Sequence, residues 1–161
     1  MAQAGVSTLG IVFSYGIETT AGEKPTTFKK LDRINSIGGI SIEPETIDAS
    51  ALEDTVERSV AGRGTTAGSF PVVVNLTDLT FAQWEKLIDE YNEMESGIRM
   101  WFQVSAPGLT NAFYVAAQPP QEIPMPDMSQ NELLTVEIPL TIDKYEGMSE
   151  KVKETENEIA A

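Results

Sequence analysis

The chain has 161 residues, of which 41% are hydrophobic and 22% charged, so it is long enough for one domain with a sizeable core. Its 25 acidic and 11 basic residues give a net charge of −14, which disfavours a nucleic-acid clamp because tight phosphate contacts depend on Lys and Arg. Cysteine and histidine are absent, which excludes disulfides and thiolate sites and removes the common zinc ligands and the usual general base. These absences argue against an enzyme.

The first half of the chain combines strand patterns with one long irregular stretch. Strands are predicted near residues 6–14 and 34–42. Residues 43–68 are polar, rich in glycine and without strong periodicity, so we expect a long loop there. It carries Leu52, Val56 and Val60 at a spacing of four among charged residues, which is too little apolar surface to fold alone but sufficient to grip a neighbouring subunit. The amino-terminal stretch has no basic region of the signal-peptide kind and no segment is long enough to span a bilayer, so we expect synthesis in the cytoplasm without membrane insertion.

A strand followed directly by a helix comes next. In "SFPVVVNLT" the alternation places Phe70, Val72, Val74 and Leu76 on one face. A helix is predicted over residues 80–96, with Thr80 and Gln83 as a capping box and Gly97 as a stop. One arc of the helix is apolar and the opposite side is acidic, which predicts packing on a sheet. The apolar arc consists of Phe81, Trp84, Leu87, Ile88 and Tyr91.

Alternating patterns in the last third of the chain predict more strands. "IRMWFQVS" has Ile98, Met100, Phe102 and Val104 on one face, and another strand is expected at 112–118. "LLTVEIPLTID" alternates most clearly, with Leu134, Val136, Ile138, Leu140 and Ile142 on a dry face and Thr135, Glu137, Pro139, Thr141 and Asp143 on a wet one. Pro139 indicates that part of this strand is an edge. The predicted fold is mainly β, an antiparallel sandwich or barrel-like domain over residues 1–145 with one flanking helix, followed by a polar tail at 146–161.

Three patterns that might indicate chemistry are weak. "AGRGTTAGSF" has the glycines of a phosphate loop but lacks the Gly-Lys-Ser/Thr sequence and leads into a strand. Glu43, Glu45 and Asp48 do not form a calcium-binding ladder. Carboxylate pairs for glycoside chemistry have no sugar-stacking aromatic cleft beside them. We therefore expect no catalytic residue, metal or cofactor.

The order of these segments resembles the tail tube protein of long-tailed bacteriophages over roughly residues 5–145. The resemblance rests on the loop "IDASALEDTVERSVAGRGTTAGSF", the strand "PVVVNLTD" and the helix "LTFAQWEKLIDEY". It implies a structural virion protein that self-assembles into stacked hexameric rings, forming a hollow tube in the virion tail for DNA ejection. It also implies a tape measure protein, a tail terminator and tail tip proteins as partners.

The resemblance also gives roles to particular residues. It implies that the long loop reaches neighbouring subunits or rings, with Leu52, Glu57, Arg58 and Arg63 at the contacts. We further hypothesise that Thr135, Glu137, Thr141 and Asp143 contribute to an acidic lumen, past which duplex DNA moves without specific binding because carboxylates repel phosphates. Three alternatives stay open: a tail terminator, an adhesin-like β-sandwich, and the inner tube of a contractile injection particle.

Overall fold

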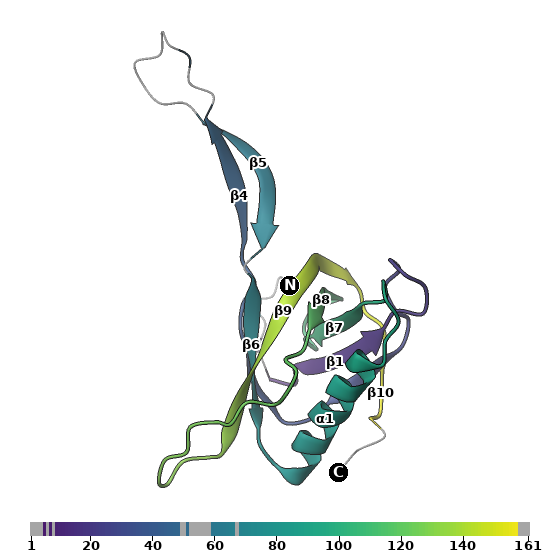
Figure 1. Cartoon of the computed structure of the whole chain (residues 1–161), viewed down its shortest axis with the longest axis vertical. Helices are drawn as coiled ribbons and strands as arrows, with labels where there is room; N and C mark the ends of the chain where they lie inside the picture. Colours follow the sequence, from purple (N-terminus) through teal and green to yellow (C-terminus); the bar gives the residue numbers. More distant parts are fainter. Residues whose placement is uncertain are drawn as a thin grey trace.

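The computed structural model describes residues 9–48, 59–66 and 68–157, together with residues 5, 7 and 51. Within these residues, ten strands and one helix follow the order β1–β6, α1, β7–β10 (Figure 1). The strands are β1 (Val12–Ile17), β2 (Phe28–Leu31), β3 (Ile34–Ile37), β4 (Ile42–Asp48), β5 (Ser59–Thr66), β6 (Ser69–Asn75), β7 (Met100–Ser105), β8 (Asn111–Gln118), β9 (Thr135–Glu150) and β10 (Glu154–Thr155). The helix is α1 (Asp78–Asn92).

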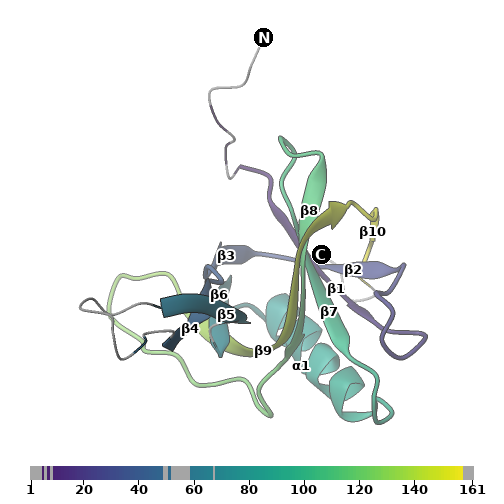
Figure 2. The same cartoon turned by 90° about the horizontal axis from the view of Figure 1, so that it is seen from above.

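Eight strands form one curled sheet in the order β10-β2-β1-β7-β8-β9-β6-β3. Every pairing in it is antiparallel except that of β10 with β2. The sheet curves around α1 as a half-barrel (Figure 2). The prediction of a mainly β, barrel-like fold with one flanking helix is confirmed.

The main core lies on the concave face of this sheet. The alternation predicted for β6 and β9 is confirmed, because Phe70, Val72 and Val74 pack with their buried counterparts on the paired strand. Those counterparts are Val136, Ile138 and Leu140. Leu134 is an exception: it precedes β9 and is 39% exposed, although the sequence pattern predicts it on the dry face.

The helix closes this core. Trp84 and Leu87 are buried in the core cluster, and Tyr91 packs against it. The predicted cap is wrong by one turn: the N-cap is Thr77, whose hydroxyl accepts from the N–H of Thr80, while the Thr80 hydroxyl accepts from the N–H of Thr77. Gln83 instead contacts the loop after β2, accepting from the N–H of Asp32 at 3.1 Å and donating to its carboxylate at 2.8 Å.

A second, smaller core lies on the convex face of β1, β2, β7 and β8. It contains Phe28, Trp101 and Tyr114, with Val152 packed against it. Strand β7 is therefore buried on both faces, whereas its sequence predicts only one dry face. Residues 146–157, which we call the strap, cover this core as the end of β9, a connecting segment and β10. The sequence predicts a polar tail from residue 146, but β9 runs through that boundary to Glu150.

Strand β9 changes partner along its length. Residues 135–141 pair with β6, and residues 141–150 pair with β8. Around Pro139 only β6 lies alongside, opposite Pro71, so the edge position predicted from this proline is confirmed for the described strands. One long strand thus joins the two halves of the half-barrel.

Candidate assembly surfaces

The most prominent feature outside the half-barrel is a hairpin of β4 and β5. The two strands pair with each other in a separate sheet, with a register shift between Pro44 and Thr46. Figure 1 shows the hairpin projecting well beyond the body. The predicted loop at 43–68 thus contains paired strands at both of its ends. Its glycine-rich return strand does not show the apolar alternation by which strands are recognised.

The hairpin is fixed to the body at its root. Gly38 donates its N–H to the carbonyl of Pro71 at 2.7 Å, and Ile142 donates to the carbonyl of Gly68 at 3.0 Å. A Cβ added at Gly38 would lie 2.4 Å from Cδ of Pro71, so only glycine allows this close approach. Of the four residues predicted at subunit contacts, Arg63 lies on β5, whereas Leu52, Glu57 and Arg58 lie outside the described residues.

The four residues predicted to line a lumen are placed on one strand, β9, away from its core-facing side chains. Glu137, Thr141 and Asp143 are exposed, and Thr135 is half-buried. Asp143 accepts a hydrogen bond from Nε2 of Gln118 at 2.8 Å. The structure therefore brings these residues together as a solvent-facing row that carries two carboxylates.

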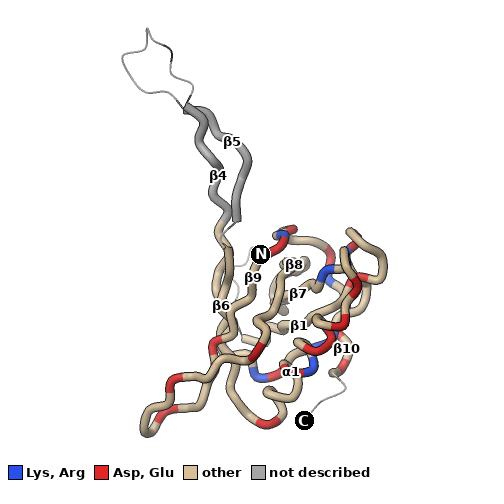
Figure 3. The backbone as a smooth tube through the Cα atoms, viewed as in Figure 1, with Lys and Arg blue, Asp and Glu red and all other residues tan. Residues whose placement is uncertain are grey.

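Acidic residues outnumber basic ones along the part of the backbone that is coloured by residue type (Figure 3). Several of the few basic residues are used within the subunit: Lys29 lies 3.5 Å from Glu90, and Lys24 lies 3.3 Å from Glu146. Such partly exposed pairs contribute little to stability, but they neutralise bases that could otherwise contact phosphate. In the part of the chain that the structure describes, no group of three or more acidic side chains could hold a metal ion. No described helix is long and apolar enough to cross a membrane.

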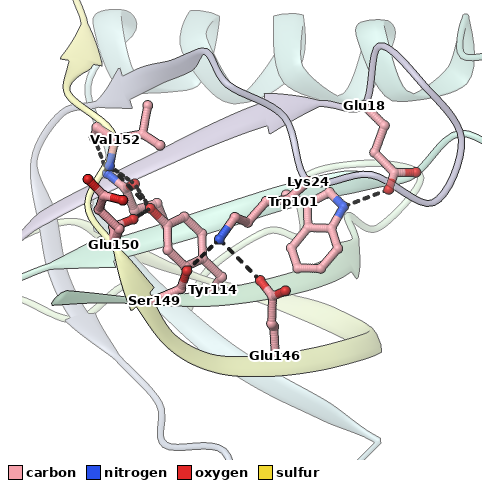
Figure 4. A network of polar contacts seen from close by, with 9 residues as sticks. Glu18, Lys24, Trp101, Tyr114, Glu146, Ser149, Glu150 and Val152 are labelled. Carbon is pink, nitrogen blue, oxygen red and sulfur yellow. Dashed lines mark hydrogen bonds and ion pairs between the residues drawn. The ribbon is translucent and has the colours of Figure 1, made fainter.

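Buried polar groups occur beside the second core (Figure 4). The Glu18 carboxylate accepts from Nε1 of Trp101 and from the backbone N–H of Arg99, each at 2.9 Å. Burial raises the pKa of Glu18, but these hydrogen bonds, one from Gly22, and the charge of Arg99 together outweigh burial and hold the pKa below its ordinary value of 4.5. Glu18 is therefore ionised at neutral pH and fixes the loop after β1.

Tyr114 connects the same core to the strap. Its hydroxyl lies 2.6 Å from both Oε1 of Gln103 and the carbonyl of Glu150, and it accepts from the N–H of Val152 at 3.2 Å. Burial is the main reason that the pKa of Tyr114 lies above its ordinary value of 10.0. The amine of Lys24 sits 3.8 Å from the centre of the Tyr114 ring and 2.8 Å from Oγ of Ser149. These contacts hold the strap in place.

An apolar groove of about 840 Å³ opens at the hairpin end of the body. Ile34, Ile37 and Ile40 line one side, and Phe113 and Val115 of β8 line another. None of the described residues that line the groove is charged. Local sequence patterns do not predict this groove, because its residues come from segments that are far apart in the chain.

Comparisons with known proteins find the same fold in tail-like particles. A chain of the cryo-EM structure of the anti-feeding prophage baseplate, symmetrised six-fold, matches with a TM-score of 0.63 and 15% identity, covering 93% of this chain and 98% of that one. A chain of the sheath/tube terminator of PVC, an extracellular contractile injection system in its extended state, matches with a TM-score of 0.65 and 16% identity, covering 92% and 99%.

A third structure, the tail of an empty GTA particle with C6 symmetry, contains a chain with a TM-score of 0.53 and 16% identity, covering 88% of this chain and 95% of that one. No protein-family model matches the sequence, and the search of curated proteins gave no match. The identities are low, so the likeness establishes the fold alone. The fold is one that occurs in chains of contractile injection systems and of a GTA tail, and the resemblance to phage tail proteins is supported at that level.

Proposed function

We propose that this protein is a structural, non-enzymatic subunit of a tail-like particle, which self-assembles into stacked hexameric rings that form a hollow tube. The observation that carries the proposal is the β4–β5 hairpin, which pairs only with itself among the described strands and projects beyond the body. Each strand of a two-stranded sheet has one edge that no strand of that sheet pairs with, and a neighbouring copy can supply a strand there. The six-fold symmetry stated for two of the similar structures supports a hexameric ring.

The proposal assigns roles to particular residues. In the proposal, Leu52, Glu57, Arg58 and Arg63 contact adjacent subunits through the hairpin, and the solvent-facing row on β9 faces the lumen. Its carboxylates, at Glu137 and Asp143, keep duplex DNA from adhering as it passes. The proposed location is a virion tail assembled in the host cytoplasm, with tape measure, tail terminator and tail tip proteins as partners.

The first test compares the full chain with a variant in which residues 42–66 are replaced by a short Gly-Ser linker. Electron microscopy and light scattering at rising concentration should show hollow filaments of uniform width for the full chain only. The urea unfolding midpoint of the body should stay close to that of the full chain, because the replaced strands pair with each other in a separate sheet. Filaments of normal width from the linker variant would contradict the role of the hairpin.

The lumen assignment needs a matched charge control. Glu137→Lys with Asp143→Lys should slow DNA passage and lower infectivity while tubes still form. Glu85→Lys with Glu93→Lys makes the same charge change at exposed positions, one on α1 and one at its C-cap, and should leave passage unchanged. Equal infectivity of both double variants would contradict the assignment of Glu137 and Asp143 to the lumen.

A specific observation favours a second candidate function. One similar structure is described as a sheath/tube terminator. A terminator caps a tube and does not polymerise, so the purified chain would stop at single rings at any concentration. Rings that bind the end of preformed tubes, with no filaments of their own, would favour this alternative.

A further inference from the structure

Exposed apolar side chains gather at two ends of the body. Among the described residues, nine large hydrophobic side chains are exposed, and all except Phe81 belong to two groups. We call the first group the groove patch; it consists of Leu9, Ile11, Phe113 and Met148. The second is the loop patch, on the segment joining β8 to β9, and consists of Met125, Met128, Leu133 and Leu134. Figure 1 shows this segment, in green, at the end of the body opposite the hairpin.

The groove patch continues the main core outward. Phe13, Val104, Phe113 and Met148 lie opposite one another on β1, β7, β8 and β9, so their side chains form one row across the sheet. The row begins with Phe13, which is 1% exposed, and ends with Phe113 at 37% and Met148 at 47%. Phe13 and Phe113 also line the groove. Among the described residues, part of this core surface therefore has no cover in the single subunit.

The loop patch is suited to fill such a groove. Met125 and Leu133 are 85% and 69% exposed. Methionine side chains are flexible and polarisable, so they adapt to irregular apolar surfaces. Four prolines, at 119, 120, 124 and 126, restrict the backbone of the segment and lower the entropy lost when it docks.

The charges around the two patches are compatible. The loop carries Glu122, Asp127 and Glu132, all exposed, beside its apolar residues. The groove is uncharged, but a neighbouring hollow shares Gly10 with it, and its charged lining residues are Lys151, Lys153 and Glu154, two basic and one acidic. Methionines inside the groove would leave the loop acids at its rim, next to a hollow in which basic residues outnumber acidic ones.

We propose that the loop patch of one copy docks into the apolar groove of a second copy, as an axial contact between successive rings. The inference rests on the proposed function and adds the segment that joins the rings. Each copy carries both surfaces at opposite ends, so the contact is head to tail, and a contact of this kind can repeat without closing on itself. Groove volumes of about 300 to 1,000 Å³ commonly hold ligands, so this groove has room for several side chains.

The test uses the absence of cysteine from the chain. Met128→Cys and Phe113→Cys are made as separate full-length proteins, mixed under assembly conditions and treated with a short bis-maleimide. The mixture should give a covalent dimer, and neither protein alone should. Phe81→Cys, an exposed apolar position on α1 outside both patches, replaces Phe113→Cys as the matched control and should give no dimer.

Three outcomes would overturn the inference. The first is filament formation without a cross-link between Met128→Cys and Phe113→Cys. That result would agree with the tube function but contradict this contact. The second is cross-linking of Phe113→Cys to Ser59→Cys, a hairpin variant, in place of Met128→Cys. The third is cross-linking in the control as strong as in the test pair. A specific dimer in a preparation that forms no filaments would support the contact and count against the tube.

A second measurement gives the strength of the contact. Met125→Ser with Met128→Ser should raise the critical concentration for assembly roughly tenfold or more, because burying one methionine side chain corresponds to about one order of magnitude in an equilibrium constant. Phe81→Ser should change it by less than about twofold, since surface substitutions away from contacts have small effects. Equal critical concentrations for the two variants would exclude the loop patch from assembly.

Discussion

The two tryptophans show how residues of the same type can have different energetic roles. Trp84 and Trp101 are both 1% exposed. Trp101 donates to the buried Glu18 carboxylate, whereas Nε1 of Trp84 has no hydrogen-bond partner among the described residues. Trp84 instead contributes apolar contact, with its ring 6.4 Å from that of Phe13.

This difference predicts a difference in stability. Trp101→Phe should lower the free energy of unfolding by about 1–3 kcal/mol more than Trp84→Phe, because it leaves a buried carboxylate short of one donor. The volume change is the same in both variants, so Trp84→Phe is the control. Urea unfolding monitored by circular dichroism measures both. Equal losses would mean that the hydrogen bond to Glu18 adds no net stability.

The lowered pKa of Glu18 predicts how this part of the stability depends on pH. A carboxyl whose pKa is depressed on folding stabilises the protein above its unfolded pKa, near 4.5, and loses that contribution as pH falls through the lower folded value. Glu18→Gln should be less stable than the parent at pH 7, and the difference should shrink below about pH 4.5. The exposed Glu23→Gln serves as control. A difference that stays constant from pH 7 to pH 3 would contradict the assignment.

At the scale of elements, the strap is expected to make a large contribution to the stability of the body. Gln103 is fully buried, and its side chain bonds both the N–H and the carbonyl of Val152. Ending the chain after Glu150 would leave these groups unsatisfied and expose the second core, so we expect a loss of about 3 kcal/mol or more. Ending it after Asn157, which keeps every described contact, should cost less than about 0.5 kcal/mol. Similar unfolding midpoints for the two truncations would show that the strap does not stabilise the body.

The elements also show what a sequence can and cannot predict. Alternation in β6 and β9 and the apolar arc of α1 predicted most of their buried faces, because each buries one side only. The exceptions are Leu134 and Phe81, which are 39% and 45% exposed. The second core was missed because β7 is buried on both faces and its cover, the strap, is polar except for residues such as Val152. The short strand β2 was missed because "FKKL" carries two lysines, one of which, Lys29, pairs with Glu90 of the helix.

Some of the candidate assembly surfaces can be predicted from local sequence patterns, and others cannot. The exposure of Glu137, Thr141 and Asp143 on β9 follows from local alternation and was predicted, whereas Thr135 is half-buried. That this row lines a lumen stays a prediction. The groove depends on β1, β3 and β8 coming together, and local patterns do not report such contacts between distant segments. The loop patch has a local sequence signal, methionines among prolines, which distinguishes it from an ordinary polar connection.

At the scale of the whole molecule, the charge of −14 determines how copies approach one another. Like-charged subunits repel, and raising NaCl from about 20 mM to about 200 mM shortens the Debye length from roughly 20 Å to roughly 7 Å. The critical concentration for assembly should therefore fall as salt rises, and light scattering would measure it. Glu85→Gln with Glu93→Gln lowers the repulsion and should weaken the salt effect. A critical concentration that rises with salt would indicate that ion pairs between subunits dominate.

The change of partner along β9 has a mechanical consequence. A pull on the hairpin reaches the body at its root, through β6, which lies antiparallel to the first half of β9, while β8 lies along the second half. A force directed along these strands loads their hydrogen bonds in shear, so many bonds must break together, whereas a force across the strands would open them one at a time. If a tail-like particle built from this protein comes under tension, β9 would transmit the force from the projecting hairpin into the half-barrel of each subunit.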